Sequence, residues 1–200
     1  MTVQRAVLDA ALEIIAADGP DLVSMREVAR RAEVSHQAPY HHFGDRSGIF
    51  AAISAEGFST LMEEFRKVIA TGPGSARRCF EAYVTFALEH PAHFRVMFRS
   101  DLCGIKTHEA TRIAADEAFN ELMKMVEHTI GRPSDDQESF TWATLLWSTA
   151  HGLSTLILDG PLLAKLPTGA SLESVISDVV DLMSGMVERQ ASRMGLLPNA

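Results

Sequence analysis

The sequence predicts an all-α protein, with an N-terminal three-helix helix-turn-helix domain joined by a long helix to a C-terminal helical bundle. Apolar residues recur at spacings of three and four in one segment after another, which is the period of an amphipathic helix. No stretch shows the sustained alternation of apolar and polar residues that a half-buried strand needs. Glycine and proline residues separate the periodic segments, so each predicted helix has a defined end.

The first two predicted helices have clear boundary signals. Apolar positions recur with helical spacing over residues 3–15, and Gly19-Pro20 follows as a stop. The second helix begins at Ser24, whose hydroxyl can accept the amide of Glu27 while the Glu27 carboxylate reaches back. This reciprocal arrangement is a capping box, and it predicts a helix that starts at this serine.

The third helix and the long helix after it differ in length. Ser35 is expected to cap the third helix, which must be short. Pro39 lacks an N–H group, so it is expected to distort the turn unless tertiary packing holds it. The long helix is expected over residues 45–70, where large apolar residues are spaced for one helical face. At about 1.5 Å per residue it would be roughly 35 to 40 Å long, enough to run from one lobe to another. It ends at residues 71–75, a segment rich in glycine and proline that cannot continue a helix.

The remainder of the chain is also predicted to be helical. Helices are expected over residues 75–90, 91–99, 107–130, 136–159 and 171–193, with loops over residues 100–106, 131–135 and 160–170. The loops hold most of the glycine and proline residues of this half of the chain, and the sequence contains no internal repeat.

Composition and charge exclude several classes of protein. The 200 residues are 46% hydrophobic and 22% charged, which is typical of a globular chain rather than a fibrous or disordered one. Two cysteines, Cys79 and Cys103, cannot build a disulfide framework or a zinc site, so we expect a reducing, cytoplasmic setting. Acidic residues interrupt the first twenty positions, and no later apolar run could span a membrane, so no membrane partner is expected. The net charge of −8 argues against indiscriminate coating of nucleic acid but leaves room for a local contact surface.

The block of residues 22–50 carries the most specific pattern. Two short helices joined by a tight turn, between a first helix and a long fourth one, form an arrangement whose second short helix can enter a major groove of DNA. The residues that match a known pattern in order and spacing are Gly19, Val23-Ser24, Val28-Ala29, Val34-Ser35, Tyr40, His42-Phe43 and Arg46. With them the sequence resembles the DNA-binding domain of the TetR family of bacterial transcriptional regulators. The resemblance implies a DNA-binding domain over residues 1–46 and a ligand-binding and dimerisation domain over residues 47–200.

Two departures from the family's pattern concern DNA contacts. Arg46 stands where the family usually has lysine, which keeps the charge and adds a planar fork suited to phosphate. Ala38 replaces a frequent threonine, so one expected phosphate contact is missing. Residues 1–50 contain five arginines and seven acidic residues, a formal charge of 5 − 7 = −2. We therefore expect modest affinity for DNA with strong salt sensitivity.

Seven residues are candidates for contact with DNA. They are Ser24, Ser35, His36, Gln37, Tyr40, His41 and Arg46. Gln37 can hydrogen-bond two atoms of an adenine edge, and the two histidines are additional donors for bases. Tyr40, Arg46 and Ser24 are expected to contact backbone phosphates. The alternative interpretation is that these are solvated polar residues on a short helix.

The candidate ligand-binding residues of the C-terminal domain are mainly apolar. They are Phe65, Phe94, Met97, Phe98, Met123, Trp142, Trp147 and His151. The segment from Trp147 to Gly152 resembles the Trp…His-Gly signature of one C-terminal domain type within the family. Trp147 and His151 share a helical face, so the histidine is either a polar handle in a pocket or a structural residue between helices. The whole set could equally form a dry core; if it lines a pocket, the effector is hydrophobic or aromatic.

Enzyme and metal chemistry find little support in the sequence. There is no nucleophile elbow, phosphate-binding glycine-rich loop or His-Glu-x-x-His motif. The pair His90 and His93 has no carboxylate or thiol nearby at ligand spacing, so neither a metal nor another cofactor is expected.

The sequence therefore predicts a ligand-responsive transcriptional regulator that binds double-stranded operator DNA. We expect a repressor that a small effector releases from its operator. We also expect a homodimer formed through the last two helices, because the last helix has a wide apolar stripe. Two alternatives stay open: a helical protein that binds small molecules but no operator, and an enzyme in the C-terminal bundle.

Overall fold

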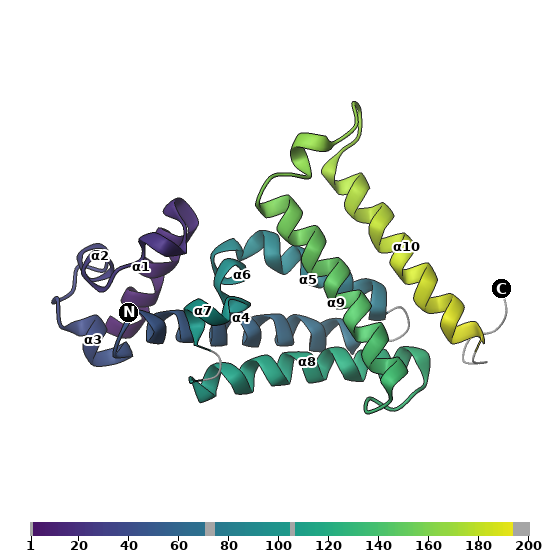
Figure 1. Cartoon of the computed structure of the whole chain (residues 1–200), viewed down its shortest axis with the longest axis horizontal. Coiled ribbons are helices and arrows are strands. Elements are labelled where there is room, and N and C mark those ends of the chain that lie inside the picture. The colour runs from purple at the N-terminus through teal and green to yellow at the C-terminus, as the bar shows by residue number, and fades with distance from the viewer. Residues whose placement is uncertain (1, 71–74, 105–106, 194–200) are drawn as a thin grey trace. The chain divides into compact units, whose positions relative to one another are not determined.

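The computed structural model describes residues 2–70, 75–104 and 107–193, which form ten α-helices and two 3₁₀ helices and contain no strand (Figure 1). The α-helices are α1 (Val3–Asp18), α2 (Met25–Arg31), α3 (Ala38–Phe43), α4 (Arg46–Ile69), α5 (Ser75–Glu89), α6 (Pro91–Met97), α7 (Ser100–Cys103), α8 (Glu109–Ile130), α9 (Gln137–Leu158) and α10 (Leu172–Arg193). The 3₁₀ helices are Pro20–Leu22 and Leu163–Lys165. The predicted all-α class is confirmed, and most predicted helices lie within two residues of the observed bounds.

The helices form two compact units. The first unit comprises Met1–Thr60 and His90–Ala118, and the second comprises Leu61–Glu89 and Phe119–Ala200. Helices α4 and α8 contribute residues to both units. The predicted division of the chain at residue 46 stays a prediction, and the contacts add α6 and α7 to the unit that holds α1, α2 and α3.

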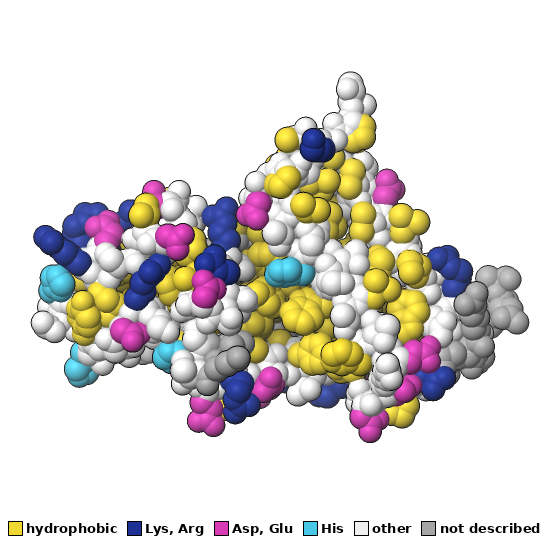
Figure 2. Space-filling view, viewed as in Figure 1, with side chains coloured by type: hydrophobic (Ala, Val, Ile, Leu, Met, Phe, Trp, Pro, Cys, Tyr) yellow, Lys and Arg dark blue, Asp and Glu magenta, His cyan; other side chains and the backbone are white. Residues whose placement is uncertain are grey.

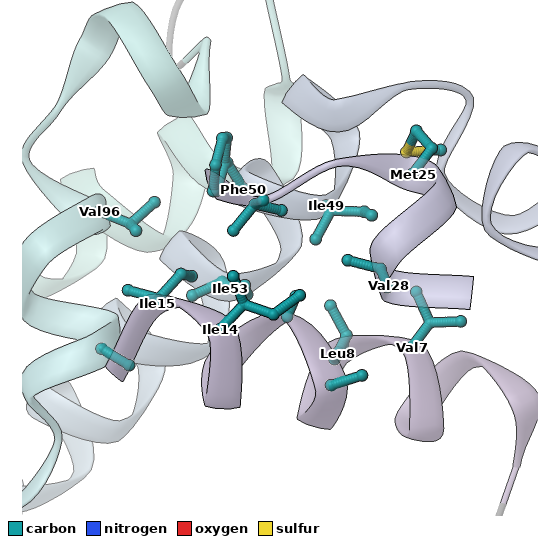
Figure 3. Close-up of a cluster of buried hydrophobic side chains, with 14 of the residues drawn as sticks. Val7, Leu8, Ile14, Ile15, Met25, Val28, Ile49, Phe50, Ile53 and Val96 are labelled. Atoms are coloured by element: carbon teal, nitrogen blue, oxygen red, sulfur yellow. The ribbon is translucent and has the colours of Figure 1, made fainter. Parts of the chain in front are cut away.

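One hydrophobic cluster holds the first unit together (Figure 3). Its fully buried side chains include Val7, Ile14, Val28, Phe50 and Val96, which come from α1, α2, α4 and α6. Removing an aliphatic or aromatic side chain of this size from water contributes about 1.5–3 kcal/mol. Helix α6 is therefore part of the core that positions the helix-turn-helix, although it follows that segment by more than forty residues.

A polar network joins the same helices at the side of this cluster. The Glu56 carboxylate on α4 accepts hydrogen bonds from Arg5 Nη1 on α1 at 2.6 Å and from the ring of His93 on α6 at 3.0 Å. Burial lowers the pKa of His93 more than the neighbouring carboxylate raises it. This histidine, considered above as a metal ligand, thus serves as a link between helices.

The start of α3 differs from the prediction. The helix begins at Ala38 and not after Ser35, and no side chain caps it. The Ser35 carbonyl instead accepts the Ala38 amide at 3.0 Å, which makes a turn before the helix. Pro39 is consequently the second residue of α3, where a missing N–H group leaves no bond unmade. The distortion expected in the absence of supporting packing does not arise, because Pro39 is buried and lies in the first turn of the helix.

Two loop predictions also need comment. The sequence predicts a loop over residues 100–106, but Ser100–Cys103 form the one-turn helix α7, which ends at Gly104 in a left-handed conformation. One turn is too short to show an apolar period, so the sequence pattern holds no signal for it. Residues 71–74 of the predicted stop after the long helix lie outside the described residues.

Candidate nucleic-acid interface

The N-terminus of α2 confirms half of the predicted capping box. The Ser24 hydroxyl accepts the Glu27 amide at 3.2 Å. The Glu27 carboxylate does not reach back, because it accepts hydrogen bonds from Arg30 at 2.6 and 2.9 Å and from Arg31 at 2.8 Å. These guanidinium partners lower the pKa of Glu27 to about 2. The sequence-based interpretation missed this ion-pair cluster, whose signal was an acidic residue three and four positions before two arginines.

The turn between α2 and α3 is a Schellman motif. The Val34 amide donates to the Ala29 carbonyl at 3.1 Å, and the Glu33 amide donates to the Arg30 carbonyl at 3.3 Å. Glu33 has φ = 54°, in the left-handed region that glycine usually occupies at this position. The turn is therefore well bonded but carries backbone strain.

Glu33→Gly is expected to stabilise the protein. An L-residue in the left-handed region destabilises the folded state by about 1–2 kcal/mol. Glycine removes this strain, but its greater freedom in the unfolded chain offsets roughly 0.5–1 kcal/mol of the gain. The net gain of about 0.5–1 kcal/mol should raise the Tm by a few degrees in a thermal melt. Glu33→Ala is the control, because alanine keeps the Cβ atom. An equal gain from both variants would contradict the assignment of strain.

The far end of α3 is held by a close approach to α4. A Cβ atom added at Gly48 would overlap the carbonyl oxygen of Phe43 and lie 3.0 Å from its carbonyl carbon. The Asp45 carboxylate accepts the Gly48 amide at 3.0 Å and fixes the first turn of α4. Gly48 thus sets the spacing between the two helices. It escaped the sequence-based interpretation, although a glycine inside the first turn of a predicted long helix was a signal.

Most of the predicted DNA-contacting residues lie on the exposed side of α3 and of the turn before it. Exposed side chains here are Ser35, His36, Gln37, Tyr40 and His41, whereas Pro39 is buried. The rings of His36 and Tyr40 are stacked, with centroids 6.5 Å apart and an interplanar angle of 8°. Figure 2 shows basic, acidic and histidine side chains mixed over the end of the molecule that holds α1, α2 and α3. The structure therefore brings five of the seven predicted residues onto one exposed polar surface.

Arg46 points back onto the protein. Its Nη2 atom donates to the Pro20 carbonyl at 2.7 Å and lies 4.0 Å from Asp21 Oδ1. Its guanidinium also lies over the Phe50 ring, 4.9 Å from the centroid. The side chain is 40% exposed, so part of the guanidinium faces solvent. Its contact with a DNA phosphate stays a prediction.

The predicted ligand-binding residues are divided between the two units. Phe94, Met97 and Phe98 belong to the first unit, where the rings of Phe94 and Phe98 have centroids 5.7 Å apart. Phe65, Met123, Trp142, Trp147 and His151 belong to the second unit. Phe65 and Met123 are buried there, and Trp142 is half-buried. A single pocket lined by the whole set stays a prediction.

His151 takes part in a helix–helix contact with a residue that the sequence-based interpretation missed. Trp147 Nε1 donates to the Tyr83 hydroxyl at 3.3 Å, and that hydroxyl lies 2.9 Å from His151 Nδ1. Because the hydroxyl oxygen accepts from the indole, its hydrogen is available to the imidazole. Burial lowers the pKa of His151, which favours the neutral ring that accepts this bond. Tyr83, on α5, had no sequence signal beyond being one aromatic among many.

The described residues offer little support for metal binding, a reactive cysteine or a membrane-spanning helix. No group of three or more potential metal-binding side chains occurs in residues 2–70, 75–104 and 107–193. Both cysteines are buried and free, and burial raises the pKa of Cys79 to about 12, so its reactive thiolate is scarce. None of the helices in the same ranges has the length and apolar character needed to cross a bilayer.

Known proteins share both halves of this pattern. Residues 7–53 match the family described as "Bacterial regulatory proteins, tetR family", and residues 76–179 match "Tetracyclin repressor-like, C-terminal domain". The chain is 25% identical over 158 residues to the "Uncharacterized HTH-type transcriptional regulator YobS" of Bacillus subtilis, covering 77% of this chain and 78% of that protein. It is 23% identical over 197 residues to the "HTH-type transcriptional repressor AcnR" of Corynebacterium glutamicum, covering 94% of this chain and 93% of that protein.

A solved structure shows the same fold. The TetR family transcriptional regulator PfmR from Thermus thermophilus is 19% identical and superposes with a TM-score of 0.70. The superposition covers 90% of this chain and 97% of that chain. At this identity the likeness concerns the fold alone.

Proposed function

The chain belongs to the TetR family of bacterial regulatory proteins, and from this premise we propose that it is a repressor which a small hydrophobic or aromatic effector releases from its operator. Proteins of this family are DNA-binding transcription regulators and not enzymes, which removes the alternative of a catalytic C-terminal bundle. A relative over nearly the whole chain is named a repressor, which supports the direction of regulation. Such a regulator works where the chromosome lies, in the cytoplasm.

The exposed polar surface of α3 is the observation that supports operator binding most strongly. Helix α3 contacts α1 and α2 on one side, and presents a glutamine, two histidines and a tyrosine on the other. A short helix fixed in this way can lie in a major groove with its side chains at the base edges. A two-fold dimer would place two such helices in grooves about 34 Å apart.

Operator binding is tested by incubating the tagged full-length protein with fragmented chromosomal DNA and sequencing the fragments retained. We expect a few fragments with inverted repeats, including DNA that flanks the protein's own gene. Retention of all fragments in proportion to their abundance would contradict a sequence-specific regulator.

Gln37→Ala is expected to relax specificity at one base pair in each half-site. Loss of a two-atom contact with a base costs about 1–3 kcal/mol at that position and leaves the other positions unchanged. The measurement is a set of equilibrium titrations with operators substituted one base pair at a time. Gln137→Ala, at an exposed position on α9, is the matched control. The assignment fails if the variant ranks the substituted operators as the wild type does.

The outer side of α10 is our candidate for the dimer interface. The inner side of α10 packs within the second unit through its buried residues Val180, Met183 and Val187. A neighbouring face of the helix, named here the α10 stripe, consists of Val175, Val179, Leu182 and Met186. Leu182 is 69% exposed and Met186 is 40% exposed. Figure 2 shows apolar side chains along α9 and α10. Such exposed apolar side chains are expected on a surface that a second copy of the chain covers.

The effector is proposed to bind in the second unit, and α4 is proposed to couple effector binding to DNA binding. The apolar surface there comes from Phe65, Met123, Trp142 and Trp147, and His151 adds a polar group that shares the Tyr83 hydroxyl with Trp147. Helix α4 contributes residues 46–60 to the first unit and 61–69 to the second, so a tilt of this helix could move the DNA-reading helices. A coupling of about 1–3 kcal/mol would lower operator affinity from several-fold to a hundred-fold.

The effector is sought by tryptophan fluorescence, because both tryptophans of the chain lie in the second unit. An apolar or aromatic compound that changes this fluorescence is expected to release labelled operator over the same concentration range. A compound that binds the second unit and leaves operator affinity unchanged would contradict the coupling for that compound.

A further inference from the structure

A hollow of about 380 Å³ lies beside α2 in the first unit. Its lining residues are Ser24, Arg26, Glu27, Ala29, Arg30, Val34 and His36. Two of them, Ser24 and His36, were predicted to contact DNA from the sequence. The charged lining residues, Arg26, Glu27 and Arg30, were not predicted to contact DNA. The hollow therefore continues the exposed polar surface of α3, and the pairing of these three side chains decides which arginine is free to meet an anion.

The glutamate offsets one of the two arginine charges of the hollow in the absence of DNA. Arg30 donates two hydrogen bonds to Glu27, one to each carboxylate oxygen, and its side chain is 69% exposed. Arg31 also donates to Glu27, but it is only 28% exposed and has a second partner, Asp18, at 3.1 Å. Arg26 is exposed and has no hydrogen-bond or ion-pair partner among the residues that the structure describes. Arg30 is thus the cation that can leave Glu27 most readily, while Arg31 keeps a partner.

We propose that this hollow receives a backbone phosphate of the operator, that Arg30 exchanges the Glu27 carboxylate for that phosphate, and that Glu27 acts as an electrostatic brake on DNA affinity. The inference rests on the proposed operator binding and adds to it a contact and a counteracting charge. A phosphate presents two oxygens to a guanidinium in the same bidentate geometry as a carboxylate, so Arg30 can turn its exposed side chain away from Glu27 and make two equivalent hydrogen bonds to the phosphate. The Glu27 charge persists at any physiological pH, because its pKa is about 2. The brake is therefore constant, and it is a physical reason for the modest DNA affinity expected from the acidic N-terminal segment.

The two arms of the proposal are tested with Glu27→Gln and Arg30→Ala in full-length protein, by fluorescence anisotropy with operator and with an unrelated duplex. Glu27→Gln keeps the backbone amide that Ser24 caps and removes only the charge. It is expected to bind both duplexes roughly 3- to 10-fold more tightly, because a negative charge near the phosphate is gone. Arg30→Ala is expected to weaken binding to both duplexes and to flatten the slope of log affinity against log salt by about one.

Glu33→Gln is the matched control for net charge. Glu33→Gln removes one negative charge, as Glu27→Gln does, so the two variants have the same net charge. Glu33 does not line the hollow. Tighter binding by Glu27→Gln than by Glu33→Gln supports the brake, and equal effects of the two variants overturn it. An unchanged salt slope in Arg30→Ala overturns the phosphate contact. If Glu27→Gln fails to fold in circular dichroism, Arg30→Ala and Arg30→Lys still decide the contact, since lysine keeps the charge without the fork. A wild type that binds no DNA at all would instead refute the proposed function.

Discussion

Gly48→Ala is expected to lower the free energy of unfolding by about 3 kcal/mol and to abolish sequence-specific DNA binding. The added methyl group would overlap the backbone carbonyl of Phe43, and a backbone atom cannot rotate away as a side chain can. The end of α3 must therefore move away from α4, and the side chains on its exposed surface move with it. Chemical denaturation and operator titration measure the two effects.

Gly185→Ala is the control for this substitution. Gly185 is also in the interior of a helix, α10, but a Cβ atom there meets only the flexible Arg189 guanidinium, at 3.2 Å. Alanine is the better helix former, so this variant is expected to be more stable by about 0.5–1 kcal/mol. Wild-type stability and operator affinity in Gly48→Ala would show that the spacing of α3 and α4 is not fixed by this glycine.

Leu182→Asp is expected to convert the dimer into a monomer and to weaken operator binding by about 100-fold or more. The substitution places an unpaired carboxylate in the centre of the α10 stripe, where a partner copy would have to bury it. A monomer engages one half-site at a time, so the gain from linked binding of two helices α3 is lost. Sedimentation velocity measures the assembly, and anisotropy measures the affinity.

The position of the substitution decides the outcome of this experiment. Val179 is half-buried in the chain itself, whereas Leu182 is the most exposed large apolar residue of α10 among the described residues. Ser177→Asp is the matched control, since Ser177 is exposed on the side of α10 opposite the stripe. A dimer that withstands Leu182→Asp but not Ser177→Asp would place the interface elsewhere.

The helix bounds were accessible from the sequence because long amphipathic periods and glycine or proline stops are strong local signals. The long helix predicted over residues 45–70 is observed as α4 over Arg46–Ile69. Short elements behaved differently: the start of α3 depends on a turn bonded through the Ser35 carbonyl, which has no side-chain signature. Helix α7 is shorter than one apolar period.

The candidate site was predictable in its residue types and less so in its pairings. The exposure of Gln37 and Tyr40 follows from a short polar helix placed in a matched helix-turn-helix pattern. The Glu27 carboxylate had a local alternative to the capping box, and two arginines outcompeted one backbone amide for it. The contact of His151 with Tyr83 joins residues 68 positions apart, a separation that local periodicity does not report.

Operator recognition by a two-fold dimer is tested most directly by comparing a full inverted-repeat operator with a duplex that carries only one half-site. Analytical ultracentrifugation of the labelled duplexes gives the number of chains bound, and anisotropy gives the affinities under the same salt. We expect two chains on the full operator, and an affinity for it that exceeds the half-site affinity by about 10²–10⁴. One chain per full operator, or equal affinity for both duplexes, would contradict recognition by two linked copies of α3.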